Sequence, residues 1–121
     1  MATVRYMVND VEQTISFYVD YLGFELKEKW GPAFAIIAKD DLTLWLSGPK
    51  TSAAQPMPDG RQPQAGGWNR IVLEVTDLQA VVDQLSQIGS IFRNTIVDGV
   101  GGKQILIEDP SGNPIELFEP K

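Results

Sequence analysis

Apolar and polar positions change their spacing along the chain in an order that predicts strands and helices. They alternate over residues 3–8, and after Asp10 the apolar residues recur at helical spacing over residues 11–22. Strict alternation is typical of a half-buried strand, whereas helical spacing places apolar side chains on one face of a helix. Asp10 is the predicted N-cap with Gln13 as its capping-box partner, and Gly23 is the predicted C-terminal stop.

Three further strands are expected after this helix, at residues 24–30, 33–40 and 42–48. The dipeptides that separate them, Gly-Pro and Asp-Asp, leave room only for hairpin turns. The first half of the chain is therefore predicted to be a β-α-β-β-β module. Residues 48–67 follow with four prolines, four glycines and almost no large apolar side chain. This composition indicates a long loop.

The same order of patterns occurs a second time in the chain. Strands are expected at residues 69–75, 91–97, 103–109 and 114–119, with a helix at 78–88. When Asp77 is aligned with Asp10, strand superimposes on strand and helix on helix, which an internal duplication explains. We expect one α+β domain over residues 1–121, made of module 1 at about 1–48, a linker loop at 49–67 and module 2 at about 68–121.

Composition narrows the class of protein. A chain of 121 residues has the size of one domain. The net charge is −6 and the ten Lys and Arg residues are scattered, so we expect no nucleic-acid partner and no anionic membrane partner. There is no apolar run near ~18 residues and no leader pattern, so a cytoplasmic location is expected. With no cysteine and no histidine, thiol chemistry and every mechanism based on imidazole are excluded.

Three segments carry a resemblance to a known superfamily: VNDVEQTISFYVDYLGFEL, VTDLQAVVDQLSQIG and EDPSGNPIELFEP. Their order and spacing resemble the vicinal oxygen chelate superfamily, which contains glyoxalase I, extradiol dioxygenases, fosfomycin-resistance enzymes and bleomycin-resistance proteins. The resemblance covers nearly the whole chain. It implies two tandem modules whose strands form a curled mixed sheet with a concave ligand cleft, and it implies a homodimer.

The resemblance also implies where a metal would bind. In metal-bearing members the ligands correspond to Thr3, Thr43, Arg70 and Glu116 of this chain. Only Glu116 carries a donor suited to a transition metal, because hydroxyls ligate weakly. Arg70 is a permanent cation that would repel a nearby divalent ion. We therefore expect no metal and no cofactor, and we expect an ion pair between Arg70 and Glu116.

Alternation within the strands assigns the remaining candidates to one face of the sheets, because residues two positions apart share a face. The predicted ligand-binding residues are Thr3, Arg5, Met7, Thr43, Trp45, Arg70, Glu74, Glu116 and Phe118. The residues between them are expected to pack against the two helices. For Trp30 and Phe34 we favour core or dimer packing, and residues 99–102 are expected to form a turn beside the cavity.

Three functions remain open at this point. The leading hypothesis is metal-free binding of a small aromatic or amphipathic molecule of the antibiotic type, because aromatic side chains in a cleft hold planar ligands. The alternative is a metal-dependent glyoxalase-like lyase, isomerase or dioxygenase with oxygen ligands around Glu116, or acid–base catalysis by Glu116 itself. A scaffold without a ligand is the third. The loop at 49–67 is equally consistent with a lid and with a linker.

Overall fold

The computed structural model describes residues 2–121 and divides the chain into two compact units. Unit 1 is Met1–Gly66 and unit 2 is Gly67–Lys121. Each unit contains one four-stranded mixed sheet and one α-helix, so the predicted α+β class and the repeated module are confirmed.

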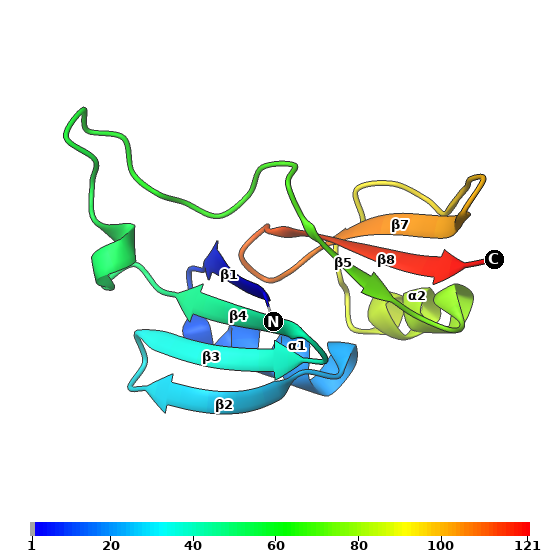
Figure 1. Ribbon diagram of the computed structural model, residues 1–121, viewed down its shortest axis with the longest axis horizontal. Coiled ribbons are helices and arrows are strands. Elements are labelled where there is room, and N and C mark those ends of the chain that lie inside the picture. Colours follow the sequence, from blue (N-terminus) through cyan, green and yellow to red (C-terminus); the bar gives the residue numbers. More distant parts are fainter. Residues whose placement is uncertain (1) are drawn as a thin grey trace. The chain divides into compact units, whose positions relative to one another are not determined.

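Unit 1 has the strand order β1-β4-β3-β2, with β1 parallel to β4 and the other pairs antiparallel (Figure 1). Its elements are β1 (Ala2–Met7), α1 (Val11–Leu22), β2 (Glu25–Trp30), β3 (Phe34–Lys39), β4 (Leu42–Ser47) and a short 3-10 helix, η1 (Ser52–Ala54). The predicted boundaries of these strands are right to within one residue, and the predicted helix at residues 11–22 has the same boundaries as α1. Apart from η1, the segment between β4 and Gly66 has no regular structure, as the loop prediction required.

The start and end of α1 follow from local chemistry. Asp10 adopts an extended conformation and its carboxylate accepts a hydrogen bond from the backbone N–H of Gln13 at 3.1 Å. This satisfies one of the N–H groups that a helix leaves without an intrahelical partner. Gly23 ends the helix in the left-handed region, at φ 78°, where glycine has no steric penalty.

The core of unit 1 lies between α1 and one face of the sheet, where α1 packs against β2, β3 and β4 (Figure 1). Of the predicted inward residues, Tyr6 on β1 and Leu44 and Leu46 on β4 are buried, while Val4 is half-buried; Ile37 on β3 is buried with them. From the helix, Tyr18 is completely buried. A β-strand turns alternate side chains to opposite faces, so the other set of strand residues lies on the face away from α1.

Unit 2 repeats this architecture with the strand order β5-β8-β7-β6, and β5 is parallel to β8. Its elements are β5 (Ile71–Glu74), α2 (Leu78–Gln87), β6 (Val97–Asp98), β7 (Gly102–Glu108) and β8 (Pro114–Pro120). The N-cap of α2 is Asp77, which accepts from the N–H of Ala80 at 3.1 Å. The two aspartates aligned from the sequence are thus equivalent caps.

The second helix buries less of its surface than the first. Only Leu78 and Leu85 of α2 are buried, whereas α1 buries six residues. Most of the stability of a protein helix comes from packing of its apolar face. The helix of unit 2 is therefore the more weakly held of the two.

The predicted strand at residues 91–97 is mostly wrong. The structure has only the two-residue β6 and an isolated bridge between Phe92 and Ile107. Next to that bridge, the side-chain oxygen of Asn94 accepts from the N–H of Leu106 at 2.9 Å. The Asn94 side chain here takes the place of a backbone carbonyl and ends the pairing with β7. Alternation of apolar residues does not reveal such a contact.

A tight turn joins β7 to β8. Asp109 is buried, and its Oδ1 accepts from the backbone N–H groups of Ser111 and Asn113. The side-chain amide of Asn113 donates to Asp109 Oδ2 at 3.1 Å. The turn thus satisfies its own buried polar groups, as expected from its Asp, Gly and Asn residues. Neither helix in the described part of the chain has the length and hydropathy needed to cross a bilayer.

Candidate functional site

The face of the unit 1 sheet away from α1 carries a continuous row of an arginine and three aromatic residues. The Arg5 guanidinium carbon lies 5.0 Å from the centroid of the Trp45 ring. Phe34 meets Trp45 edge to face at 6.0 Å, and Trp30 meets Phe34 in the same way at 6.4 Å. Each of the four strands contributes one member. We call these residues the arginine–aromatic row.

The rings of the row are packed against one another and are still partly exposed. Aromatic pairs favour edge-to-face contact and add about 0.5–1.5 kcal/mol beyond the area they bury. Trp30, at one end, is 66% exposed, and Trp45 and Phe34 are half-buried. The row therefore remains accessible within unit 1 although its rings already support one another.

Three other predicted residues lie on the same face. Thr3 and Thr43 are register partners in the parallel pair β1–β4, so their side chains are neighbours. Met7 is the register partner of Ser47, two residues beyond the Arg5–Trp45 pair on the same strands. The face predicted from alternation therefore exists in unit 1, with a polar end at the threonines and an aromatic middle at the row.

The corresponding face of unit 2 holds the predicted ion pair. Arg70 Nε and Nη2 both donate to Glu116 Oε1, at 3.2 and 2.9 Å. The Glu116 side chain is 13% exposed and that of Arg70 is 29% exposed. Arg70 Nη1 also makes a long contact of 3.4 Å with the carbonyl oxygen of Trp68. Both donors therefore use one carboxylate oxygen, and neither of them binds Glu116 Oε2.

A second arginine–carboxylate pair lies in unit 2, and the sequence analysis missed it. Arg93 Nε donates to Glu108 Oε2 at 2.9 Å. Its Nη1 and Nη2 donate to the carbonyl oxygens of Gly67 at 2.7 Å and Gly112 at 3.1 Å. The guanidinium carbon also lies 4.7 Å from the centroid of the Trp68 ring. Arg93 thus ties the first residues of unit 2 to the turn between β7 and β8.

Glu74 and Phe118 lie at the other end of this face. They are register partners in the parallel pair β5–β8, with Glu74 exposed and Phe118 half-buried. A Cβ placed on Gly101 would lie 3.8 Å from the Phe118 ring, so the Gly99–Gly102 turn runs beside Phe118. The structure therefore places all four unit 2 candidates on one side of its sheet.

The strand register shows which residues of the two units correspond. Trp45 is paired with Arg5, which precedes the helix cap Asp10 by five residues. Glu116 is paired with Val72, which precedes Asp77 by the same interval. In register, therefore, the counterpart of Glu116 in unit 1 is Trp45, while Thr43 corresponds to Pro114. One unit places a stacking surface where the other places a carboxylate.

The side chains at the positions implied for a metal do not fit one. Thr3 and Thr43 offer hydroxyls, Arg70 is a cation, and Glu116 is already bound to it. Among residues 2–121 there is no group of three or more Asp and Glu side chains close enough to hold an ion. Divalent transition metals need several anionic or imidazole donors.

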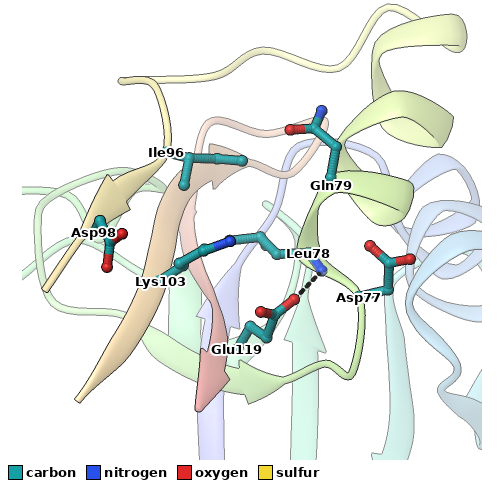
Figure 2. Close-up of a pocket in the computed structure, with 7 residues that line it drawn as sticks. All are labelled: Asp77, Leu78, Gln79, Ile96, Asp98, Lys103 and Glu119. Carbon is teal, nitrogen blue, oxygen red and sulfur yellow. Dashed lines mark hydrogen bonds between the residues drawn. The ribbon is translucent and has the colours of Figure 1, made fainter. Parts of the chain in front are cut away.

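A polar depression of about 270 Å³ lies on the helix side of the unit 2 sheet (Figure 2). Figure 2 shows the side chains of Lys103 and Glu119 between α2 and the strands, with Gln79 above them. Glu119 accepts from the N–H of Leu78 at 2.9 Å and so caps the first turn of α2 together with Asp77. This accounts for two of the carboxylates there, Asp77 and Glu119, as parts of the helix start.

The chain belongs to the Glyoxalase/Bleomycin resistance protein/Dioxygenase superfamily, whose family model matches residues 1–117. No curated protein sequence matches it.

Three solved structures illustrate the similarity. A superfamily member from Sphaerobacter thermophilus DSM 20745 is 25% identical, with a TM-score of 0.77 over 98% of this chain and 95% of that one. Lactoylglutathione lyase from Agrobacterium tumefaciens is 18% identical, with a TM-score of 0.76 over 98% and 92%. TnmS3, an antibiotic binding protein from Streptomyces sp. CB03234, is 23% identical, with a TM-score of 0.71 over 98% and 93%. The last two establish the shared fold alone.

Proposed function

We propose that this protein binds a small planar or amphipathic organic molecule without the help of a metal ion. The observation that carries the proposal is the arginine–aromatic row, in which Arg5, Trp45, Phe34 and Trp30 form an accessible surface on one face of a sheet. Stacking surfaces with a few oriented polar groups are typical of small-molecule sites. The predicted ligand residues Thr3, Met7 and Thr43 border the row on the same face.

Metal independence is supported by the chemistry of unit 2. Glu116, the carboxylate at a position implied for a metal ligand, is neutralised by Arg70 in a charge-assisted pair. A divalent ion at Glu116 would have to displace this arginine or share the site with its positive charge. We therefore assign Glu116 to ligand orientation, with Glu74 and Phe118 as further contacts.

The ligand class follows from the family and the site together. The superfamily's name includes bleomycin resistance protein, and TnmS3, an antibiotic binding protein, shares this fold. We include antibiotics among the candidate ligands, and we place the protein in the cytoplasm as a homodimer. Light scattering coupled to size-exclusion chromatography tests the dimer, which a mass near the 13.4 kDa of one chain would contradict.

The test of the binding function is a thermal melt against a chemically diverse library that includes planar antibiotics. A ligand at one hundred times its dissociation constant stabilises a protein by about 2.7 kcal/mol, which raises the melting temperature by several degrees. We expect stabilisation by planar compounds that is lost in Trp45→Ala and retained in the matched surface variant Met57→Ala. No stabilisation by any compound would favour the scaffold.

Metal analysis separates binding from the enzymatic alternative. We expect the purified protein to contain no stoichiometric nickel, zinc, manganese or iron, and we expect treatment with EDTA to leave both the melting temperature and ligand binding unchanged. A stoichiometric metal, with binding or turnover lost on chelation, would show that the protein is a metal-dependent lyase, isomerase or dioxygenase.

A further inference from the structure

Trp68 is the most exposed aromatic side chain in unit 2, at 69% of its surface, yet it is firmly supported. Arg93 stacks on one face of the indole, with its guanidinium carbon 4.7 Å from the ring centroid. The arginine itself is fixed by Glu108 and by two backbone carbonyls, and its side chain is only 15% exposed. An arginine held by three hydrogen bonds loses little further freedom, so it holds the ring in one orientation.

The backbone of Trp68 is also connected to the Arg70–Glu116 pair. Arg70 Nη1 points at the Trp68 carbonyl, while its other donors bind Glu116 Oε1. The indole, the guanidinium and the carboxylate are therefore parts of one connected network on unit 2. In this network the indole is mostly exposed, and Glu116 Oε2 receives neither of the two Arg70 donors that bind Oε1.

We infer that Trp68 is a ligand-binding residue of unit 2, that Arg93 is its positioning residue, and that the ligand is an electron-rich planar ring with an N–H or O–H donor at its edge. This inference rests on the proposed small-molecule binding function and names the class of molecule. It adds a stacking surface that is distinct from the arginine–aromatic row of unit 1.

The electronic preference follows from the arginine. A cation on one face of an indole draws π-electron density toward itself, so the opposite face attracts a second cation poorly and an electron-rich ring well. The edge preference follows from Glu116, whose Oε2 is an acceptor, while the Arg70 charge on Oε1 reduces the need for a cationic partner. A neutral heteroaromatic N–H satisfies both conditions.

The test uses the indole N–H signals in two-dimensional ¹⁵N NMR, of which three are expected because the chain has three tryptophans. Trp→Phe variants at each position assign them. The probes are indole, which has a donor at its edge, and 1-methylindole, which is the same ring without it. We expect indole to shift the Trp68 signal saturably, with binding about 3- to 10-fold weaker for 1-methylindole and for indole with Glu116→Ala.

Variants of the support separate positioning from simple contact. Arg93→Met is expected to weaken indole binding and to broaden or move the Trp68 signal before any probe is added. Arg61→Met removes an equally basic but exposed residue that pairs with Asp59, and it should change neither. Loss of Arg93 also leaves Glu108 without its partner, which can affect the fold. Trp68→Ala is therefore the second variant. The fold should tolerate this substitution because the ring is mostly exposed.

The outcomes distinguish this inference from the proposed function. If indole shifts the Trp45 signal and leaves Trp68 unchanged, the inference is overturned and binding on unit 1 stands. If the Trp68 signal responds equally to both probes, or is unaffected by Arg93→Met, the assigned ligand class or positioning role is overturned. If no tryptophan responds, the inference is overturned, and the library melt alone decides the binding function.

Discussion

Three arginines in this protein make their contacts through the planar shape of the guanidinium group. Arg5 stacks on Trp45, Arg70 donates twice to Glu116, and Arg93 combines a carboxylate, two carbonyls and the Trp68 ring. A lysine has a compact charge on a flexible stem and reproduces none of these geometries. Substitution by lysine at any of the three is therefore not conservative.

The ion pair of unit 2 yields the first prediction. Arg70→Met leaves the largely buried Glu116 carboxylate without its partner, and we expect a loss of about 1–2 kcal/mol of unfolding free energy, moderated by the solvent that reaches Arg70. Arg70→Met combined with Glu116→Gln should recover part of this loss, because no unpaired charge remains. Urea denaturation of the wild type, both single variants and the double variant measures the coupling.

Additive effects in this cycle would show that the two side chains do not interact in solution. Arg70→Lys is a useful intermediate, since it keeps the charge and loses the two parallel donors. We expect it to fall between the wild type and Arg70→Met.

The sequence was sufficient for the Arg70–Glu116 pair and insufficient for Arg93. The resemblance to the superfamily implied that Arg70 and Glu116 lie together, alternation agreed with this placement, and opposite charges that lie together attract. Arg93 lies in a segment whose strand pattern was misleading, and two of its partners are backbone carbonyls. Carbonyl groups are present at every residue, so nothing in the sequence marks the two that Arg93 binds.

At the scale of elements, local signals determined most of the fold. The caps Asp10 and Asp77, the glycine after α1 and the Asp109 turn each satisfy specific backbone groups, so their positions could be predicted. The strand at 91–97 failed because its termination depends on Asn94 reaching Leu106, a contact between residues far apart in sequence. Apolar alternation reports a preference for strand, whereas pairing depends on the neighbouring strand.

The unequal burial of the two helices leads to a second prediction. In native-state hydrogen exchange, amides of α2 should exchange by local opening at lower free energy than those of α1, because α2 buries two residues and α1 six. Mass spectrometry of peptides from each helix measures this difference. Equal protection would indicate that α2 is stabilised by packing beyond that seen within unit 2.

The first residue of β7 supplies a third prediction. Gly102 has φ 153°, and a Cβ there would lie 2.1 Å from the carbonyl oxygen of Glu119 on β8. Gly102→Ala should therefore cost more than about 1 kcal/mol of unfolding free energy. Gly99→Ala is the matched control in the same turn, where the nearest atom would be 3.6 Å away. If the control is as damaging as Gly102→Ala, the close approach of β8 is not the cause.

At the scale of the whole molecule, the chain passes from unit 1 to unit 2 through a mostly exposed segment, residues 55–67. Arg61 in this segment has a side chain that is 84% exposed and pairs only with Asp59, whereas Arg93 in unit 2 is 15% exposed. Limited trypsin digestion should cut after Arg61 well before it cuts after Arg93, because proteases need an accessible, extended backbone. Mass spectrometry of the first fragments checks this order, and initial cleavage at Arg93 would contradict it.

The distribution of tryptophans has a practical consequence for following this protein in solution. Trp30 and Trp45 belong to unit 1 and Trp68 to unit 2, so conservative replacement of one set leaves an emitting ring in a single half of the chain. Fluorescence of two such variants during denaturation would report each half separately. Coincident transitions would show that the two repeated halves unfold as one cooperative unit. Distinct midpoints would show that each half unfolds independently of the other.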